Sequence, residues 1–151
     1  MARLYPLLYV LENSVREFID RLMTSLYGDD WWNGRPMTSS KMKKLRRDVS
    51  DRMKKENKNS WHQKRGARPI DYLDFIDLRK LLRRIESDVV PKYFPCFEWL
   101  SQLMEEVYQS RCVICHMNPL SRDNAQALKL KFRQWQRQIG TRVGTLPQRV
   151  P

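Results

Sequence analysis

The sequence predicts an all-α fold, and three observations support this prediction. Apolar residues recur at steps of three and four along most of the 151-residue chain, which is the pattern of amphipathic helices. No stretch alternates apolar and polar residues for long enough to form a sheet, and no internal repeat is present. The length suits one domain with its own core. We therefore expect residues 1–140 to form a single domain and residues 141–151 a flexible C-terminal tail.

The first predicted helix covers roughly residues 4–27, and Gly28 is placed to end it. Its apolar positions are Leu4, Leu7, Leu8, Leu11, Val15, Phe18, Ile19, Leu22 and Leu26. The segment GDDWWNGRP that follows combines two Gly and a Pro with two adjacent Trp. We expect a turn whose aromatic pair packs on the core or on a partner.

The second predicted helix is basic and follows a capping cluster of Thr38, Ser39 and Ser40. Its narrow apolar stripe consists of Met42, Leu45, Val49 and Met53. Of the net charge of +12, a surplus of 10 lies between Arg35 and Arg68, where 13 Lys and Arg accompany three acids. A local excess of this size attracts polyanions such as nucleic acid. The following segment ENKNSWHQKRGARP is predicted to be a mobile loop.

The remaining helices follow from the same periodicity. Asp71 or Asp74 can cap a third helix, which ends before Pro91. Its inner face is Phe75, Leu78, Leu81, Leu82 and Ile85. After the connector PKYFP, a long helix with Phe97, Leu100, Met104, Val107 and Ile114 on its stripe runs toward Asn118 and Pro119. Ser121 can cap the last helix, on whose inner face lie Leu128, Phe132, Trp135 and Ile139, before Gly140.

Cys112, Cys115 and His116 form a C-x-x-C-H string, which allows several interpretations. The string is the attachment signature of a c-type haem, but haem attachment requires export, and the N-terminus lacks a signal-peptide pattern. A zinc site with His62 would offer one knuckle where closed sites usually pair two. Alternatively, the thiols pack as small apolar residues. We expect no metal and no cofactor.

Cysteine usage and hydropathy bear on the location of the protein. Cys96, Cys112 and Cys115 form no disulfide framework, which favours a reducing compartment. Consecutive apolar residues nowhere suffice to span a bilayer. We expect a cytoplasmic protein without a membrane partner.

Arg111 falls on the apolar stripe of the long helix, where a charge needs a compensating partner. That partner is either an anion in an active site or a structural ion pair with Glu12. His116 is either an acid–base group or a histidine favoured by the helix C-terminus. Five residues correspond to a rotation of about 140° and a rise of about 7.5 Å. One phosphate can meet both side chains if Arg111 curls along the surface, if the helix loosens before Pro119, or if two copies contribute.

The motif R-x4-H followed by MNPLS, near the end of a long helix in a small all-α chain, resembles the HEPN superfamily. LYPLLYVLENSVRE, YGDDWW, IDYLDFIDLRKLL and the last amphipathic helix are similar to the stand-alone or appended HEPN domains of bacterial defence and toxin systems. The likeness covers nearly the whole chain. It implies a HEPN-like bundle of four to five helices that dimerises, brings R-x4-H from both protomers to one cleft and cuts RNA without a metal.

The resemblance also implies roles for individual residues. The ribose 2′-hydroxyl would attack its own phosphorus, with His116 as general acid or base and Arg111 stabilising the phosphate charge. Cys112 stands where the family commonly has Asn or another polar residue. Asn118 would orient the imidazole or bind a phosphate oxygen, unless it only forms an Asn-Pro turn. Glu12 and Arg16 match the polar positions of L-E-N-x-x-R and would brace Arg111.

The basic segment would grip RNA phosphates independently of sequence, unless it is only a solvated helix face. The predicted contacts are Lys41, Lys43, Lys44, Arg46, Arg47, Lys54 and Lys55, with Trp61 available for base stacking. Two functions are therefore expected. The first is a dimeric metal-independent ribonuclease of a toxin–antitoxin or antiviral defence system, restrained by an antitoxin or other partner. The alternative is a non-catalytic HEPN-like module that binds nucleic acid or acts as a scaffold.

Overall fold

The computed structural model describes residues 3–140, and the regular structure in this range is helical. The elements in chain order are α1 (Leu4–Tyr27), the 3-10 turn η1 (Ser40–Met42), α2 (Lys43–Lys58), the 3-10 turn η2 (Pro69–Tyr72), α3 (Phe75–Arg84), α4 (Glu86–Val89), α5 (Phe97–Cys115) and α6 (Arg122–Gly140). The all-α prediction is confirmed. The predicted tail, residues 141–151, lies outside the described residues.

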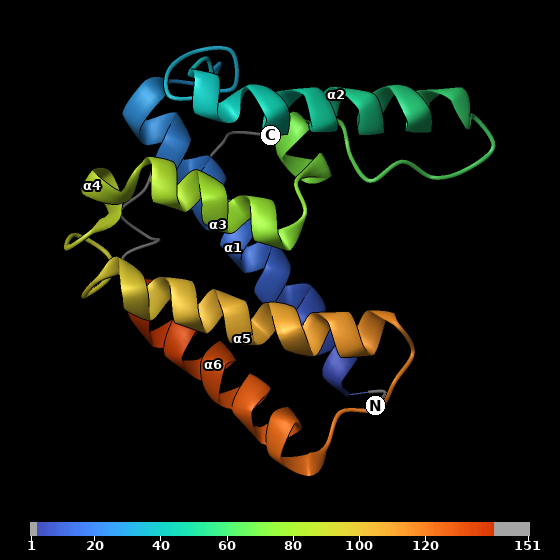
Figure 1. Ribbon diagram of the computed structural model, residues 1–151, viewed down its shortest axis with the longest axis vertical. Helices are drawn as coiled ribbons and strands as arrows, with labels where there is room; N and C mark the ends of the chain where they lie inside the picture. Colours follow the sequence, from blue (N-terminus) through green and yellow to red (C-terminus); the bar gives the residue numbers. More distant parts are fainter. Residues whose placement is uncertain (1–2, 141–151) are drawn as a thin grey trace.

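Helix α1 crosses the middle of the molecule (Figure 1). It packs against α3 and α6, while α5 packs between α3 and α6. Helix α2 lies at the far side from α5 and α6, where it contacts η2 and ends in an extended loop (Figure 1). The start of α1 lies beside the end of α5, which brings the first helix to the R-x4-H motif (Figure 1).

The centre of the bundle is aromatic. Phe18 of α1 meets the ring of Trp135 edge to face, with 5.7 Å between ring centroids, and Phe94 stacks on Trp135 at the same distance. Ring pairs in these geometries add to the stabilisation from buried area. The Trp135 indole N–H donates to the Ser14 hydroxyl over 2.9 Å, so its polar atom is satisfied. The predicted inner face of the last helix is therefore the centre of the core.

Gly28 ends α1 at the predicted position. Its φ of 85° lies in the left-handed region that L side chains rarely adopt. Its N–H donates to the Thr24 carbonyl over 2.9 Å, which satisfies one of the last carbonyls of the helix. Trp31 in the next turn is 3% exposed, and its indole N–H donates to the Asp20 carboxylate over 3.1 Å. This member of the Trp pair packs on the core, as predicted.

One predicted helix cap is wrong, and one predicted helix is interrupted. Within the predicted capping cluster, Ser39 precedes η1 and Ser40 is the first residue of η1, while α2 begins after Met42 without a side-chain cap. The apolar pattern of the third helix continues through Ile85, yet the backbone of Ile85 is not helical (ψ 25°) and separates α3 from α4. Asp74 precedes α3, as predicted, and its N–H donates to the Asp77 carboxylate over 3.2 Å. Within residues 3–140 no helix is long and apolar enough to cross a membrane.

Candidate functional site at the end of helix α5

Arg111 lies in the penultimate turn of α5 and turns toward α1. Its Nε donates to Glu12 Oε2 over 3.0 Å, and its side chain is 29% exposed. The two residues are 99 positions apart, so the contact joins the first helix to the R-x4-H motif. The predicted ion pair is therefore formed, and it compensates the charge on the apolar stripe.

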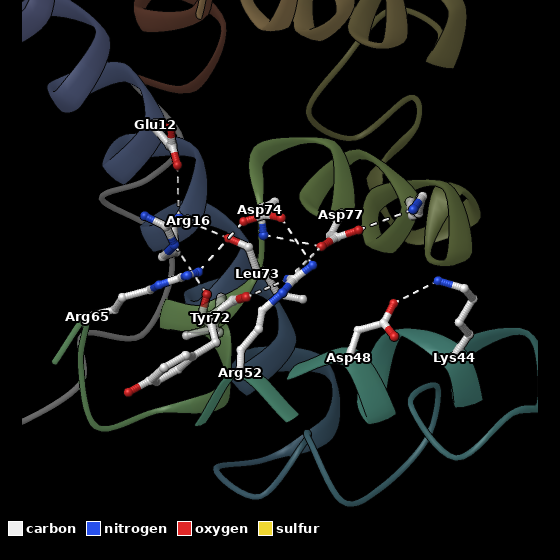
Figure 2. A network of polar contacts seen from close by, with 12 residues as sticks. Glu12, Arg16, Lys44, Asp48, Arg52, Arg65, Tyr72, Leu73, Asp74 and Asp77 are labelled. Atoms are coloured by element: carbon white, nitrogen blue, oxygen red, sulfur yellow. Dashed lines mark hydrogen bonds and ion pairs between the residues drawn. The ribbon is translucent and has the colours of Figure 1, made fainter. Parts of the chain in front are cut away.

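Glu12 is shared between two arginines. Its second oxygen, Oε1, accepts from Arg16 Nη2 over 3.2 Å. Arg16 also donates to the carbonyls of Ile70 and Leu73, both over 3.2 Å, and thereby holds the segment before α3 against α1 (Figure 2). Arg16 thus fixes Glu12, and Glu12 fixes Arg111. Glu12 therefore contacts Arg111 directly, whereas Arg16 acts on Arg111 only through Glu12.

The electrostatics keep Arg111 charged. Burial alone would lower the pKa of its guanidinium, but the charge of Glu12 and the hydrogen bond to it outweigh burial and raise that pKa above the ordinary value. Only Nε is used by Glu12. Within the described part of the chain, Nη1 and Nη2 of Arg111 have no hydrogen-bond acceptor. These two amino groups form a fork that can bind two oxygens of one phosphate.

His116 caps the C-terminus of α5 and is exposed to solvent. Its backbone N–H donates to the Cys112 carbonyl over 3.1 Å, and Met117 then turns the chain with a φ of 61°. Asn118 closes the turn: its N–H donates to the Val113 carbonyl over 3.1 Å and its side-chain amide to the His116 carbonyl over 3.2 Å. Asn118 therefore takes the structural role here, because its amide holds backbone and not the imidazole.

The fold does not join the two motif side chains in one copy. Arg111 faces α1, whereas His116 stands at the exposed helix end, and residues 3–140 contain no hydrogen bond between them. This agrees with the rotation of about 140° that five helical residues produce. The three arrangements by which one phosphate would meet both side chains therefore stay predictions: Arg111 curling along the surface, loosening of the helix end, or a second copy.

The cysteines near the motif make different contacts. A hydrogen bond with the Cys112 side chain is the largest cause of a raised pKa at Tyr108, one turn earlier. Cys115 is exposed at the last position of α5. His62 lies in the loop after α2, where its Nδ1 is 2.8 Å from the Gln63 carbonyl oxygen. Across the described residues, no three His, Cys, Asp or Glu side chains are grouped so that they could hold a metal ion.

The predicted RNA-binding residues differ in how far they are buried. Arg46 is half-buried, and the other predicted contacts are exposed: Lys41, Lys43, Lys44, Arg47, Lys54, Lys55 and Trp61. Lys44 is paired with Asp48 over 2.9 Å. Three arginines of the same segment, which were not predicted contacts, instead make ion pairs within the fold. Arg52 binds Asp74 and Asp77, both at 3.1 Å (Figure 2). Arg65 and Arg68 also pair with acids.

An exposed aromatic pair on α1, beside the site, was not predicted from the sequence. Tyr5 and Tyr9 of α1 are 62% and 63% exposed. Together with Glu12 and Arg16 they recur at steps of four, three and four, which places them on one face of the helix. The spacing could have been found in the sequence, but only the larger apolar stripe of the same helix was considered there. An exposed aromatic surface therefore continues into the Glu12–Arg111 contact.

Comparison with known proteins identifies the family. Residues 7–140 match the family described as Swt1-like HEPN, and this range contains α1 from Leu7 onward and every later helix to the end of α6. No curated protein and no solved structure matches the chain. The match includes Glu12, Arg111 and His116. The chain therefore belongs to the Swt1-like HEPN family, as a HEPN-type nuclease or a related module.

Proposed function

We propose that this protein is a metal-independent endoribonuclease in which Arg111 and His116 perform the cleavage. The observation that carries the proposal is the state of Arg111, whose Nε is held by Glu12 while Nη1 and Nη2 remain available within the described chain. An arginine oriented on one side by a carboxylate can present its fork to a phosphate. The family match supports the coarser statement, a HEPN-type nuclease or a related module.

The chemistry requires a proton acceptor, a proton donor and stabilisation of charge. The ribose 2′-hydroxyl attacks the adjacent phosphorus, the 5′-oxygen leaves, and a 2′,3′-cyclic phosphate remains. An imidazole can take the proton of the 2′-hydroxyl or protonate the leaving oxygen near neutral pH, and His116 is exposed to meet RNA. The guanidinium of Arg111 stabilises the additional negative charge on the phosphate oxygens.

A homodimer solves the separation of the two side chains. Tyr5 and Tyr9 form an exposed surface on the α1 face that carries Glu12. If a second copy packs on this surface, its His116 can approach the Arg111 fork of the first copy. Such an enzyme damages the RNA of its own cell, so we place it in a toxin–antitoxin or antiviral defence system with a restraining partner.

The test uses RNA cleavage without divalent metal. Wild-type protein and His116→Ala are incubated with labelled transfer, ribosomal and messenger RNA in EDTA, and the product ends are analysed. We expect 2′,3′-cyclic phosphate ends from the wild type and none from His116→Ala, with melting temperature and RNA affinity little changed. Gln109→Ala, an exposed position of α5, is the control and should cleave like the wild type. Cleavage by His116→Ala would exclude His116 as the catalytic group.

The second candidate is a non-catalytic HEPN-like module that binds nucleic acid or acts as a scaffold. The observation that favours it is Cys112, whose thiol offers RNA only a weak donor and acceptor. If neither wild type nor His116→Ala cleaves and both bind RNA tightly with strong salt dependence, this function is preferred. Cys112→Asn is then the substitution with which to look for restored cleavage.

A further inference from the structure

The end of α2 and the loop after it form a surface that the Arg111–His116 chemistry does not use. Helix α2 and this loop lie on the opposite side of the molecule from α5 and α6 (Figure 1). Here we call α2 together with residues 59–68 the basic arm. The inference drawn from it does not rest on the proposed cleavage, because none of its residues contacts Arg111 or His116.

The cations on the outer face of the basic arm are available for a ligand. Lys43, Arg47, Lys54 and Lys58 recur at steps of four, seven and four, which places them on one face of α2. Each is exposed, and none has an ion pair within residues 3–140. The opposite face, with Leu45 and Val49, is buried. A helix of this length presents the row of charges along about 24 Å.

The fold holds the basic arm in place. Arg52 reaches from the inner side of α2 to Asp74 and Asp77, which fixes the helix to the start of α3 (Figure 2). The loop is held at its end by Arg65, whose Nε lies 2.8 Å from Glu56 Oε1 and whose backbone N–H donates to Glu56 Oε2 over 3.0 Å. The basic arm is thus divided into structural arginines and exposed cations.

The loop after α2 carries Trp61 with its ring exposed to solvent. It is 82% exposed, the most exposed aromatic side chain of the described chain, and contacts His62 edge to face at 5.4 Å between centroids. An open hollow of about 480 Å³ lies between this loop and the end of α2, lined by Glu56, Asn59 and residues 61–65. A ring face beside amide donors and acceptors is suited to one unpaired base.

We infer that the basic arm is a binding site for single-stranded nucleic acid, separate from the proposed cleavage site. The phosphates lie along Lys43, Arg47, Lys54 and Lys58, and one base stacks on Trp61. Charge alone would also suit a duplex or an anionic membrane. The exposed ring and the polar hollow favour a single strand, because stacking requires a base that is free of its complement.

The experiment measures binding without cleavage. The probe is a fluorescein-labelled 2′-O-methyl uridine 12-mer, which has no nucleophilic 2′-hydroxyl, and affinity is measured by anisotropy between 50 and 200 mM salt. Trp61→Ala should weaken binding about tenfold. Lys43→Glu with Arg47→Glu should weaken it and reduce the slope of log affinity against log salt by about 0.7 for each phosphate that is no longer neutralised. Trp61→Phe should retain most of the affinity.

The matched control is Lys129→Glu with Arg133→Glu, which changes the same residue types at the same spacing on the exposed side of α6. It should bind the 12-mer like wild type. Equal losses of affinity from the α2 and α6 pairs would overturn the proposal in favour of general charge attraction. Unchanged affinity in Trp61→Ala would overturn it as well, as would tighter binding to phosphatidylserine vesicles or to a duplex than to the 12-mer. Melting temperatures of all variants establish that each is folded.

Discussion

Glu12 decides how Arg111 is presented. It holds Nε of Arg111 and is itself held by Arg16, which is bound to the carbonyls of Ile70 and Leu73. Glu12 is therefore a positioning residue in the proposed enzyme, because it acts through Arg111 and not on RNA.

The substitution Glu12→Gln retains the shape of the side chain and removes its charge. We expect the turnover number for RNA cleavage to fall about tenfold to a hundredfold through misplacement of Arg111, with KM little changed. The free energy of unfolding should fall by about 1–2 kcal/mol, because a charge-assisted hydrogen bond is weakened. Cleavage kinetics and denaturant unfolding measure the two effects.

The matched control is Glu17→Gln, an exposed position on the same helix with no ion pair in the described chain. It should change neither turnover nor unfolding. A raised KM in Glu12→Gln, with the turnover number intact, would contradict the positioning role and indicate ground-state RNA binding.

Side-chain contacts that burial determines could be predicted from the sequence. The Arg111–Glu12 pair could be expected, because a cation on an apolar stripe requires a compensating anion. The behaviour of Asn118 could not be decided, because it depends on the left-handed backbone at Met117. Residue spacing does not encode which of two acceptors, an imidazole or a carbonyl, such a turn brings to the amide.

The end of α1 is the element whose boundary can be tested most cleanly. Gly28 has a positive φ, and no atom lies within 4 Å of the position that a Cβ would occupy. The cost of a side chain there is therefore conformational and not steric.

We predict that Gly28→Ala lowers the free energy of unfolding by about 1–2 kcal/mol, because an L residue resists the left-handed region. The melting temperature should fall by about 2–4 °C for each kcal/mol. Gly140→Ala is the matched control: its site is also open, its φ is not positive, and it should be neutral. A loss of stability in Gly140→Ala as large as in Gly28→Ala would contradict the explanation. Thermal unfolding followed by circular dichroism measures both.

The element boundaries show which signals are reliable. Gly28 ended the first helix as predicted, because its backbone freedom is used at the cap. The break at Ile85 escaped prediction, because Ile85 and Val89 are both buried and continue the apolar pattern across a non-helical residue. Periodicity reports which residues face the core, and it does not report whether the backbone between them stays helical.

The molecule as a whole presents the two proposed functional surfaces on opposite sides. One is the end of α5 with the adjoining α1 face, and the other is the basic arm (Figure 1). In the proposed dimer the α1 face is covered, while both basic arms remain outward. A long RNA could then be held at an arm and cut at the interface.

We predict that the protein is a dimer and that Tyr9→Arg makes it a monomer, because a charge would be buried without a partner in the proposed interface. RNA cleavage should be lost together with the dimer. The control is Leu130→Arg, an exposed apolar position on α6, which should remain dimeric and active. Sedimentation velocity across a range of protein concentrations measures the association. A Tyr9→Arg dimer, or an active Tyr9→Arg monomer, would contradict the composite site.

The five tryptophans differ in exposure, so tryptophan fluorescence can report on the basic arm. Trp31 and Trp135 are buried in the core, Trp32 and Trp99 are half-buried, and Trp61 stands in water among cations. Iodide, an anionic quencher, gathers at the arm and reaches this indole first. The fluorescence that iodide quenches therefore comes chiefly from Trp61. Protection of Trp61 from quenching then reports a ligand bound at the loop after α2, without any label on the protein.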